Sequence, residues 1–218
     1  MNTRRRGWLV LDVDETLVGH RRPPLPGADA AWIHGRGGDL PTGIYARPHL
    51  DRFLDWALER YHVGLWTAAP QAHAERAARH LLGARASELA LLWSERQCRV
   101  RALDARGAEV ALASPDAILE APLKEVSSVV EALGADPRRL LVVDDSPWAV
   151  DDPAHHVPIP PYVLRNARAL PSETLLLELM TYLDTLADVD DVRDVDKTGW
   201  LAPRWVLRSR RERMVPGA

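Results

Sequence analysis

The sequence of 218 residues predicts an α/β domain built on a mostly parallel sheet. Short apolar runs of strand length alternate along the chain with amphipathic segments of helical period. Three of these runs, residues 8–11, 62–66 and 140–143, end directly before polar residues. Ligands of parallel sheets bind beyond the carboxyl ends of the strands, so the sequence also predicts where a functional site lies.

The first half of the chain contains two predicted strands and two predicted helices. Residues 7–12 form a continuous apolar run, which is typical of a strand covered on both faces. Residues 20–43 are rich in Pro, Gly and Arg and lack a period, so we expect a loop with one short strand near Trp32. The remaining elements are a helix opened by Pro48, a strand at residues 62–66, and a helix at residues 71–82 stopped by Gly83.

The second half adds strands, an insertion and a last helix. A strand is expected at residues 89–93 and another at residues 140–143. Residues 99–103 and 109–113 predict a small β-hairpin within an insertion that spans residues 94–122. Residues 124–133 predict a helix, and Ser172 is expected to cap the final helix. We therefore expect one domain over residues 1–197, followed by a basic tail at residues 198–218.

Composition is that of a soluble globular protein, with 46% hydrophobic and 27% charged residues. A net charge of -3 gives no indication of a general nucleic-acid or membrane-surface binder. The single cysteine, Cys98, excludes an internal disulfide and suits a reducing compartment. The apolar run that follows the basic residues 4–6 ends at Asp12, which is too short for a signal peptide or a membrane span. We expect a cytoplasmic protein.

The opening acidic motif, residues 12–17, predicts phosphate chemistry. Asp12 and Asp14 are two positions apart on an extended segment, so their side chains share a face and repel each other unless positive charge lies between them. Asp12 can attack phosphorus and form an aspartyl-phosphate, with a divalent cation between the two anions. Asp14, with a pKa raised toward neutrality, can protonate the leaving oxygen and later deprotonate water.

Three further polar residues complete the predicted site. Asp144 follows the apolar run at residues 140–143 and is expected to be a second carboxylate ligand, and oxygen-only ligation favours Mg²⁺. Thr67 is expected to donate a hydrogen bond to a phosphoryl oxygen. Lys124, one of the two lysines in a chain that otherwise uses arginine, is expected to neutralise the transferred group and keep Asp12 ionised.

Each of these residues also has a simpler explanation. Paired aspartates such as Asp144 and Asp145 before Ser-Pro often form turns, and a lysine at a helix start is usually solvated. A functional site is nevertheless favoured, because four features occur together in this order and at strand ends: the Asp12/Asp14 pair, Thr67, Lys124 and the Asp144/Asp145 pair. Other candidates are weaker: His20, His155 and His156 lack metal-ligand spacing and are expected on the surface, and core packing is favoured for Trp148 over a place at the site mouth.

The motif at residues 12–17 resembles the signature of the haloacid dehalogenase superfamily of phosphatases. The chain as a whole is similar to the phosphatases of the RNA polymerase II C-terminal domain (CTD), which include the small CTD phosphatases and the Dullard-like, NLI-interacting-factor-like proteins. This resemblance covers roughly residues 7–197 and depends on five further stretches: residues 47–54, 64–68, 123–126, 140–147 and 191–193.

The resemblance implies a Rossmann-like haloacid dehalogenase core with a small β-insertion between the second and third motifs. It implies Mg²⁺, Asp12 as nucleophile, Asp14 as acid/base and Asp144 as metal ligand, with Asp145 near the metal. The expected metal set is thus Asp12, Asp14, Asp144 and Asp145. The insertion is longer and richer in alanine than that of the family, so no substrate groove is carried over.

The leading hypothesis is an Mg²⁺-dependent phosphatase that acts on a phosphoserine or phosphothreonine protein through phospho-Asp12. The family lacks a large cap, and an open site admits bulky substrates. A nucleic-acid or small-metabolite phosphatase is the alternative, although the overall charge gives nucleic acid no support. A non-catalytic phosphate-binding domain such as a receiver also clusters acids, but its acids follow a different order. The sequence leaves the oligomeric state open.

Overall fold

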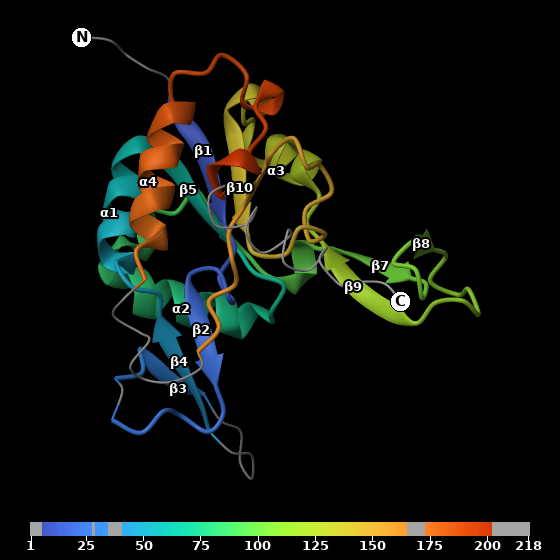
Figure 1. Ribbon diagram of the computed structural model, residues 1–218, viewed down its shortest axis with the longest axis horizontal. Coiled ribbons are helices and arrows are strands. Elements are labelled where there is room, and N and C mark those ends of the chain that lie inside the picture. Colours follow the sequence, from blue (N-terminus) through green and yellow to red (C-terminus); the bar gives the residue numbers. More distant parts are fainter. Residues whose placement is uncertain (1–5, 28, 35–40, 165–172, 202–218) are drawn as a thin grey trace, which may run out of the picture.

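A five-stranded parallel sheet forms the centre of the computed structural model, which describes residues 6–27, 29–34, 41–164 and 173–201 (Figure 1). The strand order is β11-β10-β1-β5-β6, and every neighbouring pair is parallel. The predicted α/β class with a mostly parallel sheet is confirmed. The strands are β1 (Gly7–Leu11), β5 (Tyr61–Trp66), β6 (Leu91–Trp93), β10 (Leu140–Asp144) and β11 (His156–Pro158).

Helices cover both faces of this sheet. Alternate residues of β1 explain why: Leu9 and Leu11 pack into one apolar core and Val10 into another on the opposite face. The first core is closed by α1 (Leu50–Arg60), α2 (Gln71–Leu82) and α4 (Leu175–Leu186), and the second by α3 (Val126–Leu133). Figure 1 shows α1 and α4 on one side of the strands and α3 on the other.

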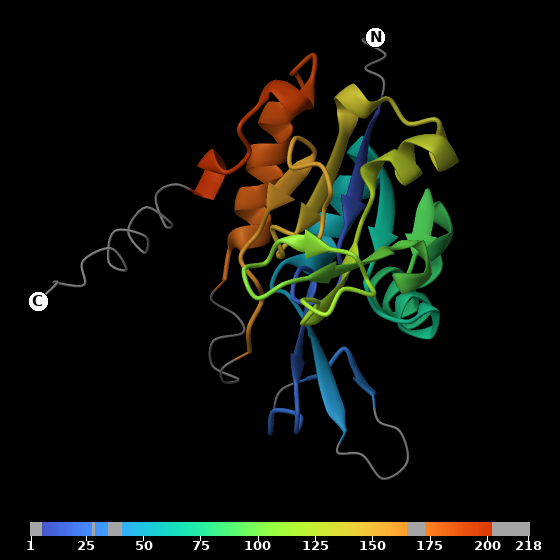
Figure 2. The same ribbon diagram turned by 90° about the vertical axis from the view of Figure 1, so that its right-hand side faces the viewer.

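A second, antiparallel sheet extends from the core between β1 and α1. It contains β2 (Val18–Arg21), β3 (Trp32–His34) and β4 (Thr42–Ala46) in the order β2-β4-β3, and it lies at the bottom of Figures 1 and 2. The strand near Trp32 was predicted, and residues 22–27 and 29–31 are loop as expected, but residues 20–21 and 42–43 at the two ends of the expected loop belong to strands. The other two strands, β2 and β4, each contain a glycine, which weakens the strand pattern in their sequences. At Gly19 a Cβ atom would meet Tyr162 O at 2.7 Å, so only glycine fits this close approach.

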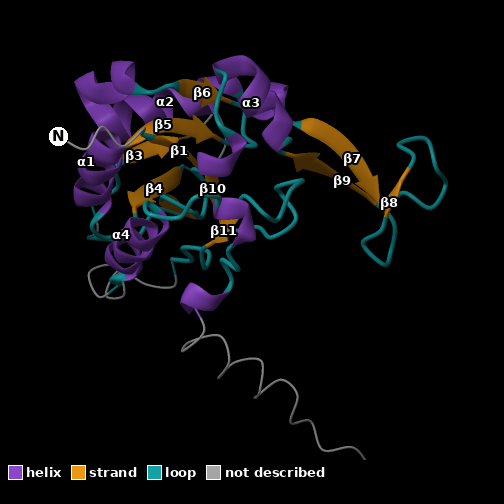
Figure 3. Ribbon diagram, turned by 90° about the horizontal axis from the view of Figure 1, so that it is seen from above, coloured by secondary structure: helices purple, strands orange, loops and turns teal. Residues whose placement is uncertain are grey.

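The insertion is a three-stranded antiparallel sheet that projects away from the core (Figure 3). The predicted hairpin is present as β7 (Arg99–Leu103) and β8 (Glu109–Val110), although β8 is shorter than expected. A third strand, β9 (Leu119–Leu123), was not predicted. It pairs with the other edge of β7 along its whole length. Pro122 interrupts the strand pattern there, and proline is tolerated because β9 is an edge strand.

The ends of several elements differ from the expectation. The helix at residues 71–82 is confirmed, but α1 begins at Leu50 rather than Pro48, and α3 begins at Val126 rather than Lys124. The expected cap Ser172 lies outside the described residues. Leu201 is buried in the first core, so the chain packs on the domain beyond residue 197, and residues 202–218 of the basic tail lie outside the described part.

None of the helices in the described ranges combines the length and the apolar character that crossing a membrane demands.

Candidate active site

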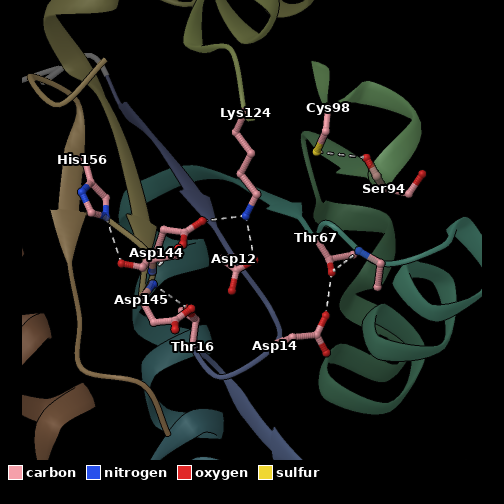
Figure 4. A network of polar contacts seen from close by, with 12 residues as sticks. Asp12, Asp14, Thr16, Thr67, Ser94, Cys98, Lys124, Asp144, Asp145 and His156 are labelled. Carbon is pink, nitrogen blue, oxygen red and sulfur yellow. Dashed lines mark hydrogen bonds and ion pairs between the residues drawn. The ribbon is translucent and has the colours of Figure 1, made fainter. Parts of the chain in front are cut away.

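The register of the central sheet brings the two strongest predicted acids together. Leu11 at the end of β1 pairs with Val143 of β10, so the residues that follow them, Asp12 just after β1 and Asp144 at the end of β10, lie side by side. The Asp12 N–H continues the ladder and donates to Val143 O at 2.9 Å. Figure 4 shows both carboxylates at this edge of the sheet. Two residues that lie far apart in the sequence therefore share one site.

The Lys124 ammonium lies between these carboxylates. Its Nζ donates to Asp12 Oδ1 at 2.6 Å and to Asp144 Oδ2 at 2.7 Å, and its side chain is 2% exposed. The lysine backbone is fixed between β9 and α3, because Lys124 N donates to Ala149 O at 2.7 Å. Burial alone would lower the pKa of Lys124, but the charges of Asp12 and Asp144 outweigh it and hold that pKa well above its ordinary value.

The Asp12 carboxyl group is buried deeply enough to change its pKa. Burial raises the pKa of Asp12 to about 7; the Asp144 charge adds to the rise, and the Lys124 ammonium opposes it. One ammonium therefore does not fully compensate two buried carboxylates. A further cation would stabilise the ionised form of Asp12.

Three carboxylates could hold such a cation. One oxygen each from Asp12, Asp144 and Asp145 lie within 4.8 Å of one another. Burial raises the pKa of Asp145 to about 6, with the charges of Asp144 and Glu15 as further causes. The donors are all hard oxygen atoms around a partly neutralised negative charge, which fits Mg²⁺ better than a softer metal.

The Asp14 carboxylate lies outside this cluster of three, and its expected place among the metal ligands stays a prediction. Its Oδ2 accepts a hydrogen bond from Thr67 Oγ1 at 2.7 Å. Its Oδ1 lies 2.8 Å from His73 Nε2 and 2.9 Å from His20 Nε2. Figure 4 shows Asp14 pointing toward Thr67 and away from Asp144 and Asp145.

The titration of Asp14 also differs from the expectation of a raised pKa. Burial alone would raise the pKa of Asp14, but the hydrogen bonds from His20, His73 and Thr67 outweigh it and hold this pKa below its usual range. Sequence reasoning considered only the neighbouring acids and could not see the three donors. Asp14 is therefore a carboxylate at neutral pH.

Thr67 lies at the site with its hydroxyl directed to Asp14. Its hydroxyl proton points to Asp14, and its oxygen accepts the Ala69 N–H at 3.0 Å. The expected hydrogen bond from Thr67 to a phosphoryl oxygen stays a prediction.

The expectation of surface histidines is wrong. His155 and His156 are 3% and 7% exposed, and their rings bond to the backbone oxygens of Leu140 and Asp144 at 2.8 and 2.9 Å. His20 is half-buried against Asp14. The histidine that sequence reasoning missed, His73, lies on α2 and carries no local signal, since its partner is 59 positions away.

An arginine from the predicted Arg-Pro segment braces the loops around the site. Arg47 is 1% exposed and donates to Thr16 O and to Pro160 O, each at 2.8 Å. It also holds Glu173 through two nitrogens, at 2.7 and 3.0 Å. Thr16 in turn accepts the Asp145 N–H at 3.1 Å. The arginine thus ties the opening acidic motif to the loop that follows β11.

A pocket of about 700 Å³ opens above the acids, between the core and the insertion. Asp12, Asp14, Lys124, Asp144 and Asp145 line its polar side. The opposite side is lined by Leu103 and Leu119 of the insertion and by Trp148, which is 66% exposed. Core packing of Trp148 was favoured and is wrong; the alternative, the site mouth, is where it lies. The pocket places acids, a cation and an apolar wall together.

Comparisons with known proteins agree with this arrangement. The family model of the NLI interacting factor-like phosphatases matches residues 8–193. A CTD nuclear envelope phosphatase 1 homologue of Drosophila melanogaster is 26% identical over 201 residues, covering 88% of this chain and 72% of the relative. The human carboxy-terminal domain RNA polymerase II polypeptide A small phosphatase 1 is 30% identical over 189 residues. This match covers 86% of this chain and 62% of the human protein.

A solved structure shares the fold. The fission yeast RNA polymerase II CTD phosphatase Fcp1, bound to beryllium fluoride, superposes with a TM-score of 0.50 at 16% identity, covering 98% of this chain and 58% of that one. The chain therefore spans less than two thirds of the length of this structure and of the human relative. The resemblance stated from the motifs is confirmed, and with it the enzyme class. The chain belongs to the NLI interacting factor-like phosphatases, which are phosphoric monoester hydrolases of the haloacid dehalogenase type.

Proposed function

We propose that this protein is an Mg²⁺-dependent phosphatase that removes phosphate from phosphoserine or phosphothreonine in proteins through a phospho-Asp12 intermediate. One observation carries the proposal: the carboxylates of Asp12 and Asp144 share the Lys124 ammonium at the floor of an open pocket. The arrangement has one more negative than positive charge, so a divalent cation beside these carboxylates would be needed before a phosphate monoester could approach.

The metal would be held by Asp12, Asp144 and Asp145, the three carboxylates whose oxygens converge. When bound, Mg²⁺ supplies positive charge that lets an anionic nucleophile approach an anionic phosphate. The protein contributes the rest. Lys124 holds Asp12 with one oxygen hydrogen-bonded, which fixes the orientation of the carboxylate before it reacts.

The reaction proceeds in two displacements. In the first, an oxygen of Asp12 bonds to phosphorus, the bond from phosphorus to the serine or threonine oxygen breaks, and that oxygen takes a proton from a solvent water in the open pocket. In the second, a water oxygen bonds to phosphorus, the bond to Asp12 breaks, and Asp14 takes a proton from the water. The hydrogen bonds to Asp14 keep it ionised, so it has a lone pair that can accept this proton.

A protein substrate is supported by the form of the pocket and by the relatives. The pocket is open and has an apolar wall of Leu103, Leu119 and Trp148, which suits the side chains of a peptide. The human relative is named for the carboxy-terminal domain of RNA polymerase II, a protein segment. Only two of the residues that line the pocket are cationic, Arg101 and Lys124, and Lys124 is already paired. A nucleic acid finds little basic surface there.

The experiment is a substrate panel. Phosphate release is measured from phosphoserine and phosphothreonine peptides, a 3'-phosphorylated oligonucleotide and a sugar phosphate, each with Mg²⁺ and with EDTA. The proposal expects Mg²⁺-dependent turnover that is fastest on the peptides, and none for Asp12→Asn. Faster turnover of the oligonucleotide or the sugar phosphate would replace the protein substrate, and phosphate binding without turnover would indicate a binding domain.

A further inference from the structure

Two histidines from different elements meet on one carboxylate oxygen of the site. His20 comes from β2 of the antiparallel sheet and His73 from α2 of the core. Their Nε2 atoms lie 2.9 and 2.8 Å from Asp14 Oδ1. An ionised carboxylate only accepts hydrogen bonds, so both imidazoles carry a proton on Nε2. Asp14 thus joins two parts of the fold.

The two rings are themselves held in place. Their centroids lie 6.1 Å apart, and on the other side the His73 ring lies 6.2 Å from the ring of Trp32, which is 5% exposed. The His73 side chain is 17% exposed and that of His20 31%. Groups packed in this way direct their hydrogen bonds with little rotational freedom.

Among the residues that the structure describes, these contacts leave Asp14 with one vacant acceptor position. A carboxylate has about four lone-pair sites. The imidazoles fill both sites of Oδ1, and Thr67 fills one site of Oδ2. The vacant site is therefore on Oδ2, and Asp14 lines the pocket in which the phosphoryl group is expected.

We propose that His20 and His73 are positioning residues that orient the Asp14 carboxylate for the second displacement. They hold it so that its vacant lone pair accepts a proton as a water oxygen bonds to phosphorus and the bond from phosphorus to Asp12 breaks. This role rests on the proposed function, because it assumes a phospho-Asp12 intermediate. It predicts that loss of either imidazole slows hydrolysis of the intermediate rather than its formation.

The test is acid-quenched trapping of the phosphoenzyme during steady-state turnover of a ³²P-labelled phosphopeptide with Mg²⁺. His73→Ala and His20→Ala are expected to lower kcat about tenfold with KM no higher, and to raise the trapped phosphoenzyme severalfold. His73→Gln, whose amide can still donate to Asp14, is expected to recover much of the rate. His80→Ala is the matched control, because His80 is on the same helix and stacks on the same Trp32 at 5.1 Å. It is expected to behave as wild type.

The outcomes separate this role from the proposed function. A fall in kcat without additional phosphoenzyme in either alanine variant would overturn the positioning role while phosphatase activity stands. The positioning role would also be overturned if the kcat of His73→Gln were no higher than that of His73→Ala, or if the kcat of His80→Ala were as low as that of His73→Ala. Wild-type protein that forms neither phosphate nor phosphoenzyme would overturn the proposed function itself, and the role with it.

Discussion

Asp12 and Asp144 share a single ammonium nitrogen, with their oxygens 2.6 and 2.7 Å from Lys124 Nζ. The three side chains come from three segments of the chain, and the parallel register of β1 and β10 fixes the two acids side by side. The site therefore contains two buried negative charges and one positive charge. This imbalance leads to the first three predictions.

Removing the ammonium should destabilise the protein, and a metal should repair part of the loss. Lys124→Met leaves two like charges buried without a partner, so we expect the free energy of unfolding at pH 8 to fall by about 3–5 kcal/mol in EDTA. Mg²⁺ should recover more stability in this variant than in the wild type. Urea unfolding with EDTA or Mg²⁺ measures both effects.

The other lysine provides the control. Lys197 is 3% exposed and donates to Ala154 O and Val195 O, at 2.6 and 2.9 Å. Lys197→Met should also destabilise the protein, but Mg²⁺ should give it no extra recovery. Equal recovery in both variants would mean that the metal does not act at the shared ammonium.

The pH dependence of stability should reveal Asp12. The unfolded carboxyl has a pKa of 3.8 and the folded one about 7, so between these values the folded state holds a proton that the unfolded chain has lost. The Asp12 contribution to stability therefore falls as pH rises through this window, by no more than about 1.4 kcal/mol per pH unit for one proton. Asp12→Asn removes this contribution, so its decline in EDTA should be shallower. Parallel curves for the two proteins would show that the Asp12 pKa is not raised.

Asp144 should control metal binding. Because a ligand that binds only the folded state raises its stability, Mg²⁺ should raise the Tm of the wild type. Asp144→Asn should abolish most of this shift, since it removes a carboxylate of the cluster. Asp151→Ala is a nearby control that removes the acceptor of the hydrogen bond from Val126 N to Asp151 Oδ1 at 2.8 Å. Its Tm should fall without loss of the Mg²⁺ shift; loss of the shift in both variants would argue against a local metal site.

Trp148 should contribute to peptide binding. Its side chain is 66% exposed at the pocket mouth, which leaves its apolar surface free to contact a substrate. Trp148→Ala should raise KM for a phosphopeptide several-fold, by about 1 kcal/mol of contact energy, and leave p-nitrophenyl phosphate unaffected. Ile33→Ala, at an equally exposed position on β3, should change neither. An unchanged KM for the peptide would remove Trp148 from the binding surface.

Most of the central fold could be predicted because its signals are local. The runs at residues 8–11 and 140–143 are apolar along their whole length and are followed by acids, and helix α2 ends at a glycine as expected. The antiparallel strands were harder. β2 and β4 each contain a glycine that a neighbouring group requires, and β9 contains a proline, so their sequences lack strand periodicity.

Which residues gather at the site could be predicted better than which contacts they make with one another. Apolar runs of strand length before the acids indicated Asp12 and Asp144, and its rarity in an arginine-rich chain indicated Lys124. The surroundings of Asp14 were not predictable, because His20 and His73 reach it from separate elements and reverse the direction of its pKa shift. Burial of His155 and His156 likewise depends on tertiary packing around β10 and β11. Long-range partners of this kind leave no pattern in a single sequence.

The most direct test of the account is to locate the phosphoryl group on the protein. Wild-type enzyme turning over a phosphopeptide with Mg²⁺ is quenched and treated with borohydride, which reduces an aspartyl-phosphate to homoserine, and peptides are then mapped by mass spectrometry. The account predicts homoserine at position 12, absent without substrate and absent in Asp12→Asn. Turnover without modification at Asp12, or with modification at another carboxylate, would contradict it.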